Sequence, residues 1–308
     1  MHLQHSLCYN TIQYKYCMER GINMRLSEVW ELYETDRSLE GYSKHTLNSY
    51  RLQHRLFVEW YGDHSINDVT YEDIKSYLAK DAKRLKPASI AFRMKYFRSL
   101  WRYAVDEGII DDNPASRLRD PKLPKRIPKY MEAEEIEMLR MACETTFENA
   151  LLEVFFASGC RIGEIYQANK NVVNWTDKSM TIVGKGDKER TVFFDVRCAI
   201  YLKKYLNERN DNNVALFVTE RRYKAEGNQP RRISKDGMRW TLNRIARRAG
   251  IENVYPHRLR HTFAMHMLKN GAPLEVIQQF LGHANLDTTR IYADHNTEMR
   301  RELYRKYF

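Results

Sequence analysis

Apolar residues recur at helical spacing through the first third of the chain, between residues 25 and 112. Val29, Leu32 and Tyr33 form one such stripe, and another runs from Tyr50 to Trp60. Residues three and four apart lie on one face of a helix, so these stripes predict amphipathic helices that each bury one side. We therefore expect residues 25–114 to form a bundle of about four helices.

Local signals mark where these helices begin and end. Ser43 offers a capping hydroxyl to the second helix, and Thr70 and Asp73 have the spacing of a capping box before the third. The fourth helix is predicted over residues 87–107, and Gly108 follows it as a favoured helix-end residue. These signals support the helical prediction independently of the apolar stripes.

Residues 115–129 interrupt the periodic pattern. This stretch holds three prolines and six basic residues, and proline removes backbone donors and favours an extended chain. It predicts a basic linker between a helical domain over residues 25–114 and a second domain over residues 130–308. Residues 1–24 are an N-terminal extension of unsettled status, because Met24 is an alternative start.

Beyond the linker, helical patterns surround one strong strand signal. Helices are expected over residues 132–143, 150–158, 238–249, 257–270 and 274–281. Runs rich in β-branched and aromatic residues at 180–183 and 190–194 flank a turn that contains glycine, which predicts a β-hairpin. The expected fold class is mainly α with a small β-hairpin or sheet, in two domains.

The charge balance indicates a polyanionic partner. The chain has 51 Lys and Arg against 40 Asp and Glu, a net charge of +11 with a pI near 9.3, and this favours nucleic acid. Five cysteines are scattered without a CxxC pair, so we expect neither a disulfide framework nor a zinc site, and a reducing cytoplasmic location. No apolar run reaches the length of a membrane span.

Basic residues gather in two regions where DNA contacts are expected. One is the predicted helical domain, where basic and aromatic residues interleave on the fourth helix, and the other is the segment 221–235. The candidate DNA contacts are Lys44, Arg93, Lys95, Arg98, Arg231 and Arg232. A solvated charged face over an aromatic core explains the first group equally well. For the second region, a loop on DNA and a solvated insertion both stay open.

One set of residues has the chemistry of a phosphodiester site. His257 and Arg260 stand three apart at the start of a predicted helix, and therefore on one face. A guanidinium such as that of Arg161 or Arg260 is a planar fork that grips phosphate oxygens through two hydrogen bonds. A tyrosine such as Tyr292 can act as a covalent nucleophile once its proton is removed. Each residue alone has an ordinary structural explanation, so only the joint pattern is informative.

The joint pattern resembles the tyrosine recombinase (phage integrase) family, and within it the short Xer-like type. It consists of Arg161 in RIGE, Lys185 in the hairpin turn, His257 and Arg260 in HRLR, His283 in LGH, and Tyr292. Order, spacing and local sequence agree from about residue 25 to the C-terminus, without a departure at these six positions. The resemblance implies a two-domain clamp, with a helical core-binding domain ahead of the catalytic domain.

The resemblance also implies a role for each residue. Arg161 and Arg260 would hold the scissile phosphate, a task for preorganised cations. Tyr292 would attack phosphorus to form a 3′-phosphotyrosyl bond, and Lys185 would protonate the leaving 5′-oxygen. The remaining implied roles are general acid–base catalysis for His257, a hydrogen bond to the phosphate for His283, and an orienting carboxylate for Glu164.

Partners and alternatives follow from the same resemblance. It implies double-stranded DNA, a homotetramer on two synapsed sites that is a monomer in free solution, and no metal, ATP or other cofactor. A C-terminal helix over residues 296–308 would dock on a neighbouring protomer or pack within its own chain. A type IB topoisomerase-like enzyme and a non-catalytic DNA-binding regulator of the same fold are the alternatives. The target sequence stays open, as does the choice between integration, cointegrate resolution and dimer resolution.

Overall fold

The computed structural model describes residues 23–122, 129–184, 188–223, 229–282 and residue 305. It divides into two compact units, Met1–Lys125 and Arg126–Phe308. Most described residues are helical, and the strands among them form two small antiparallel sheets, which confirms the predicted fold class. In the described part of the chain no helix has both the length and the apolar character needed to cross a membrane.

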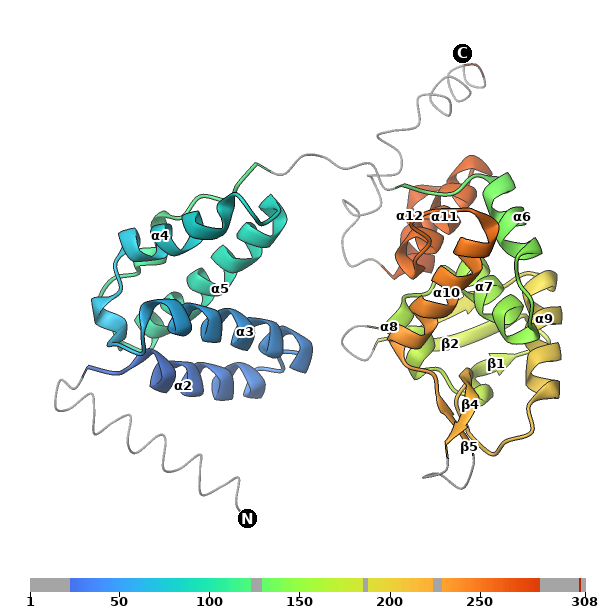
Figure 1. Cartoon of the computed structure of the whole chain (residues 1–308), viewed down its shortest axis with the longest axis horizontal. Coiled ribbons are helices and arrows are strands. Elements are labelled where there is room, and N and C mark those ends of the chain that lie inside the picture. Colours follow the sequence, from blue (N-terminus) through green and yellow to red (C-terminus); the bar gives the residue numbers. More distant parts are fainter. Residues whose placement is uncertain (1–22, 123–128, 185–187, 224–228, 283–304, 306–308) are drawn as a thin grey trace. The chain divides into compact units, whose positions relative to one another are not determined.

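The described residues of the first unit form a four-helix bundle, as predicted. Its elements are α2 (Leu26–Leu39), α3 (Lys44–Tyr61), η1 (Ile66–Asp68), α4 (Tyr71–Ala82), α5 (Pro87–Asp106) and η2 (Pro114–Arg117). Helix α5 packs against α2, α3 and α4 (Figure 1). The predicted caps are confirmed, since the Ser43 side chain accepts from the Thr46 N–H at 3.1 Å and Thr70 and Asp73 form a reciprocal capping box.

Aromatic side chains fill the centre of this bundle. Phe57, Phe97 and Trp101 are fully buried, and the Phe57 and Phe97 rings meet edge to face with centroids 4.9 Å apart. Such pairs add to the free energy gained from burying their apolar area. The first residues of the predicted linker also belong to this core, because Ala115 and Leu118 are buried against it.

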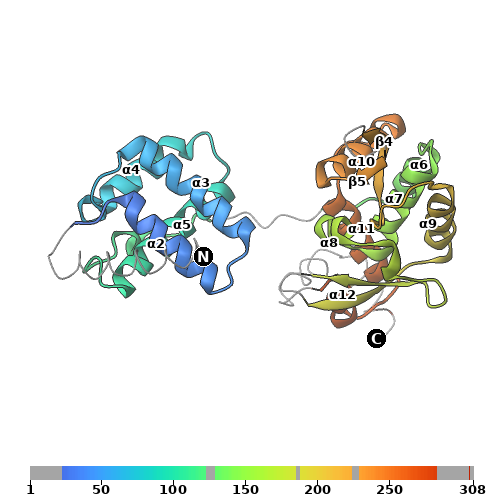
Figure 2. The same ribbon diagram turned by 90° about the horizontal axis from the view of Figure 1, so that it is seen from below.

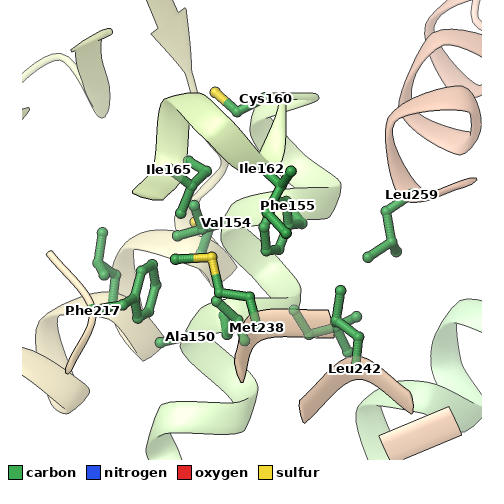
Figure 3. Close-up of a cluster of buried hydrophobic side chains, with 14 of the residues drawn as sticks. Ala150, Val154, Phe155, Cys160, Ile162, Ile165, Phe217, Met238, Leu242 and Leu259 are labelled. Atoms are coloured by element: carbon green, nitrogen blue, oxygen red, sulfur yellow. The ribbon is translucent and has the colours of Figure 1, made fainter. Parts of the chain in front are cut away.

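The second unit is built around one central helix. Its helices are α6 (Ala133–Met141), α7 (Thr146–Ser158), α8 (Ile162–Gln167), η3 (Lys170–Val172), α9 (Val196–Glu208), α10 (Lys235–Ala249), α11 (Pro256–Lys269) and α12 (Leu274–Leu281). Helix α7 contacts α9, α10 and α11, and Figure 2 shows α9 on one side of it and α11 on the other. Apolar side chains from α7, α8 and α10 meet in this core, as Val154, Ile162 and Met238 do in Figure 3.

Two antiparallel sheets complete the second unit. The first has the order β1 (Val173–Asn174), β2 (Ser179–Val183), β3 (Glu189–Phe193), which confirms the predicted hairpin. The second pairs β4 (Val218–Tyr223) with β5 (Gln229–Arg232). The expectation of a plain loop or insertion over residues 221–235 is therefore wrong at its edges, where backbone pairing forms strands although the side chains are polar. Helices α7 and α10 also begin earlier than predicted, because Thr145 and Ser234 cap them.

Candidate active site

Arg161 lies in a turn between two helices of the second unit. Helix α7 ends at Gly159, whose φ of 60° is left-handed, a conformation that glycine adopts without strain. Arg161 then caps the N-terminus of α8. Its Nη1 donates to Glu164 Oε1 at 2.9 Å, and its Nη2 donates to the Gly282 carbonyl at 3.1 Å. The side chain is 33% exposed, so this cation is fixed in position and still open to solvent.

Arg260 reaches the same place from α11. Pro256 occupies the first turn of that helix, which suits its fixed φ. Arg260 is buried, and its Nη1 donates to the Gly159 carbonyl at 2.8 Å. Its Nη2 donates to the carbonyl of Leu281. Arg161 and Arg260 therefore hold successive carbonyls at the C-terminal end of α12, where helix carbonyls lack partners within the helix.

A buried carboxylate joins this cluster to the first sheet. Glu164 accepts from Arg190 Nη1 at 2.7 Å and Nη2 at 2.8 Å, and from the Arg161 backbone N–H at 2.6 Å. Burial alone would raise the pKa of Glu164, but the hydrogen bonds from Arg190 and Arg161 outweigh it and hold that pKa below its ordinary value. Glu164 is therefore ionised at neutral pH, which supports its predicted orienting role.

Sequence reasoning missed Arg190. It lies on β3 and binds both oxygens of Glu164, while its Nε donates to the Phe280 carbonyl at 3.1 Å. One signal was available, since Arg190 stands two residues before the buried Val192 and so on the inward face of its strand. A charged residue at an inward position indicates a buried partner.

His257 lies near this cluster with its ring partly in solvent. Partial burial, then Arg260 and Arg161, lower the pKa of His257 below its ordinary value. Like charges nearby disfavour the protonated imidazole, so His257 is neutral at pH 7. One turn further along, burial and the neighbouring His257 lower the pKa of His261 to about 4. A neutral imidazole can accept a proton, as the predicted acid–base role of His257 requires.

Comparison with known proteins identifies the family that contains this arrangement. The sequence profile described as "Phage integrase family" matches residues 129–299, more than half of the chain. The chain belongs to this family, the tyrosine recombinases. A second profile, "Phage integrase, N-terminal SAM-like domain", matches residues 31–108. The recombinase is thus a DNA strand-transferring enzyme by class.

Individual relatives agree with this assignment. Tyrosine recombinase XerC of Staphylococcus aureus (strain USA300 / TCH1516) is 34% identical to the recombinase over 280 residues, 85% of this chain and 90% of that protein. The crystal structure of XerA recombinase matches with a TM-score of 0.52 and 28% identity, over 92% of this chain and 98% of that one. XerH site-specific recombinase bound to palindromic difH substrate, in a post-cleavage complex, matches at a TM-score of 0.71 and 20% identity, over 96% and 88%. At that identity the XerH likeness concerns the fold alone.

Three predicted catalytic residues of the recombinase, Lys185, His283 and Tyr292, lie outside the described residues. Their chain neighbours are described for two of them. Gly184 directly precedes Lys185, and its N–H donates to the Lys188 carbonyl at 2.8 Å. Gly282 directly precedes His283 and ends α12 with a left-handed φ of 59°. The described cluster thus contains Arg161, Glu164, His257 and Arg260.

The basic candidates of the helical unit differ in how they are held. Lys44 and Lys95 are exposed. Arg98 donates to Asp120 at 2.9 Å and to the Leu118 carbonyl at 2.7 Å, so it ties the end of the unit to α5. Arg93 is buried, pairs with Asp81 at 2.5 Å and stacks on the Tyr77 ring. Its guanidinium is committed to the fold, so the exposed Lys44 and Lys95 are better candidates for DNA contact than Arg93.

The two candidate DNA-binding residues on β5 also differ in exposure and hydrogen bonding. Arg231 is exposed. Arg232 donates to the carbonyls of Tyr166 at 2.7 Å and Ala168 at 2.8 Å, and to the Asn169 side chain. Arg232 therefore closes the C-terminal end of α8. Within the described ranges no three histidine, cysteine or acidic side chains lie close enough to hold a metal ion.

Proposed function

We propose that this protein is a site-specific recombinase that cuts and rejoins double-stranded DNA through a 3′-phosphotyrosyl bond to Tyr292. One observation carries the proposal. Arg161 and Arg260 come from different elements and reach the successive carbonyls of Gly282 and Leu281, immediately before His283 in the chain. Two arginines 99 positions apart in the chain thus converge, as binding of one phosphate would require.

The proposed chemistry conserves the bond energy of the DNA backbone. The Tyr292 oxygen attacks phosphorus, the bond from phosphorus to the 5′-oxygen breaks, and Lys185 gives that oxygen a proton. Arg161 and Arg260 stabilise the charge that develops on the non-bridging oxygens. Rejoining reverses these steps with a 5′-hydroxyl from another duplex. Side-chain cations supply the charge, so the proposed reaction uses neither a metal ion nor ATP.

The histidines and the carboxylate have supporting roles in this proposal. His257 is neutral at pH 7 because partial burial and nearby arginines lower its pKa, so it can accept the tyrosine proton. His283 donates a hydrogen bond to the phosphate in the transition state. Glu164 holds the Arg161 fork in one orientation through its hydrogen bond at 2.9 Å.

Covalent trapping tests the proposal. The recombination site is first selected from random duplexes that the protein binds, and a nicked version of it is then incubated with the protein and denatured. We expect a protein–DNA adduct with the wild type and none with Tyr292→Phe. A wild type that gives no adduct on its selected site contradicts the proposal. Binding should also weaken steeply with salt, because phosphate contacts release counterions.

Products distinguish recombination from the alternatives. Exchange between two duplexes supports the recombinase, whereas relaxation of supercoils without exchange supports a type IB topoisomerase-like enzyme. Binding without an adduct supports a DNA-binding regulator. We expect a monomer in free solution and a tetramer on two sites, measurable by mass photometry with and without DNA. Phage or element integration, cointegrate resolution and dimer resolution then differ in the sites that serve as substrates.

A substrate with a sulfur leaving group tests Lys185. When sulfur replaces the bridging 5′-oxygen, the departing thiolate needs no proton because a thiol is far more acidic than an alcohol. Lys185→Ala should therefore cleave the natural DNA slowly and the sulfur-substituted DNA at close to the wild-type rate. Equal losses on both substrates would contradict the acid role.

The catalytic unit has a groove whose apolar lining suits the apolar residues of the C-terminal segment. An apolar groove of about 390 Å³ is lined mainly by Phe156, Phe193, Phe263, Met267 and Phe280. Residues 296–308 include the apolar residues Met299, Leu303 and Phe308, and we propose that this segment of one protomer occupies the groove of its neighbour. Removing residues 296–308 should abolish the tetramer and spare monomeric DNA binding. A tetramer that survives the truncation would contradict this docking.

A further inference from the structure

Arg190 connects three segments of the catalytic unit through one guanidinium. It donates to both oxygens of Glu164, at 2.7 and 2.8 Å, and to the Phe280 carbonyl at 3.1 Å. Its side chain is only 14% exposed. Burial opposes its charge, but the hydrogen bond and the charge of Glu164 raise the pKa of Arg190. All three of its nitrogens are therefore engaged with protein acceptors.

Each of these contacts leads to a different residue of the proposed mechanism. Glu164 holds Arg161 through a hydrogen bond of 2.9 Å. Phe280 stands three residues before His283, at the end of α12. Arg190 itself pairs with Ile182 across the hairpin, whose turn carries Lys185. Arg190 thus lies where the three segments meet.

The backbone around Arg190 leaves little room for a side chain of a different shape. A Cβ atom added at Gly282 would lie 3.1 Å from Arg190, and one added at Gly184 would lie 3.4 Å from its Nη1. A Cβ atom at either position would be in tight contact with Arg190. Glycine at both positions therefore lets the backbone lie directly against the guanidinium. A lysine in its place would supply a point charge without the planar fork.

We infer that Arg190 is a positioning residue for strand cleavage, which acts through Glu164 on Arg161 and through the Phe280 carbonyl on the end of α12. This inference rests on the proposed function. Arg190 does not touch the phosphate in this account. Its loss should therefore slow cleavage while DNA affinity stays close to that of the wild type, because a shift of about 1 Å in reacting groups can cost roughly 10²-fold in rate.

The test compares Arg190→Lys with Arg140→Lys. Arg140 is a matched control, since it also binds a buried glutamate with two nitrogens, Glu153 at 2.7 and 2.8 Å, but contacts no residue of the cluster. The measurements are the adduct-forming rate at saturating DNA, the DNA Kd and the Tm. We expect Arg190→Lys to lose roughly 10²-fold in rate with little change in Kd, and Arg140→Lys to lower Tm without slowing cleavage.

A double variant keeps the test decisive if Arg190→Lys folds poorly. Glu164→Gln combined with Arg190→Gln removes both charges and leaves no buried charge unpaired between them. If Arg190 acts in part through Glu164, the rate loss of this pair should be smaller than the product of the two single losses. Multiplied losses would overturn the inference, as would a normal rate for Arg190→Lys or an equal loss for Arg140→Lys. If the wild type formed no adduct, the proposed function itself would be wrong.

Discussion

The two units bury polar groups in opposite ways. The helical unit packs aromatic rings around His54, a buried histidine whose ring stacks on Trp30 at 4.9 Å and whose Nδ1 lies 2.9 Å from the Tyr96 hydroxyl. Among its described residues no carboxylate is buried. The catalytic unit buries Glu148, Glu153 and Glu164, and each is bound by two arginines. The helical unit thus relies mainly on aromatic packing, with one buried arginine, Arg93, paired with Asp81, whereas the catalytic unit buries carboxylates that arginines compensate.

The difference shows that buried ion pairs have two uses within one unit. Glu148 joins α7 to α10 through Arg244 and Arg248, and Glu153 joins α7 to α6 and α9 through Arg140 and Arg197. Both networks tie helices together. The Glu164 network differs because its arginines also bind carbonyls at the end of α12, Arg161 that of Gly282 and Arg190 that of Phe280. A buried carboxylate in this unit therefore points to the candidate site only where its arginines also hold another segment of that site.

The largest effect expected from this contrast concerns two arginines on one helix. Arg260 belongs to the cluster, whereas Arg258 donates to Glu135 at 3.0 Å and to the Glu252 carbonyl at 2.7 Å. Arg260→Ala should slow adduct formation by about 10³-fold, since it removes a preorganised donor to the phosphate. Arg258→Ala should lower Tm and leave the rate per folded molecule unchanged. If Arg260→Ala and Arg258→Ala lost a similar factor in rate in single-turnover assays, the distinction between the two arginines would be wrong.

Removing a buried carboxylate should be the largest change in stability. Glu148→Gln leaves two arginines without their buried partner, and we expect it to lower the free energy of unfolding by about 3 kcal/mol. The matched control is Glu59→Gln in the helical unit, where Glu59 pairs with Arg55 on an exposed surface at 3.4 Å. That change should cost less than about 1 kcal/mol. Urea unfolding measures both, and equal effects would contradict the contrast between the units.

Acid should weaken the helical unit through His54. Burial lowers the pKa of His54 to about 4, whereas an unfolded histidine titrates near 6.5. The unfolded state therefore binds the proton first, so stability is complete above pH 6.5 and falls as the pH drops toward 4. Between pH 7 and pH 5 the loss should be about 2 kcal/mol. Hydrogen exchange of α3 and α5 amides checks this, and His54→Gln, compared at each pH, should lack that loss.

The smallest expected effect is on the pH profile of cleavage. Arg239 is one of the cations that lower the pKa of His257, after burial, Arg260 and Arg161. Arg239→Gln should raise that pKa, so the acid limb of the cleavage rate moves to higher pH while the plateau stays the same. A lower plateau rate with no change in the pH of the acid limb would show that Arg239 does not act on the pKa of His257. Single-turnover rates between pH 5 and pH 8 make this measurement.

Local signals made much of the fold predictable. Helix α12 runs from Leu274 to Leu281 as the sequence predicted, because its apolar stripe is bounded by Pro273 and Gly282. The hairpin of β2 and β3 was also predictable from β-branched runs around a turn. Strands β4 and β5 were not predictable from the sequence. Both are mostly polar, and β5 contains Pro230, which is unusual inside a strand.

The candidate site was predictable only as far as its residues form a pattern along the chain. Arg161 and Arg260 were expected to share a phosphate, and the structure brings both to the end of α12. Arg190 escaped because its partners Glu164 and Phe280 lie 26 and 90 positions away. Single-sequence periodicity reports which face a residue occupies and not which distant residue it meets. Long-range polar pairs can therefore be identified only in the folded structure.

The grip of Arg161 and Arg260 on α12 also fixes the order in which the site can be completed during synthesis. The bonds of Glu164 to Arg161 and Arg190 can form as soon as β3 has been made. The bond from Arg161 to Gly282 spans 121 positions and must wait until α12 has left the ribosome. A nascent or prematurely terminated chain therefore holds its arginines near one another without their final orientation. The ability to cut DNA is thus restricted to nearly finished protein.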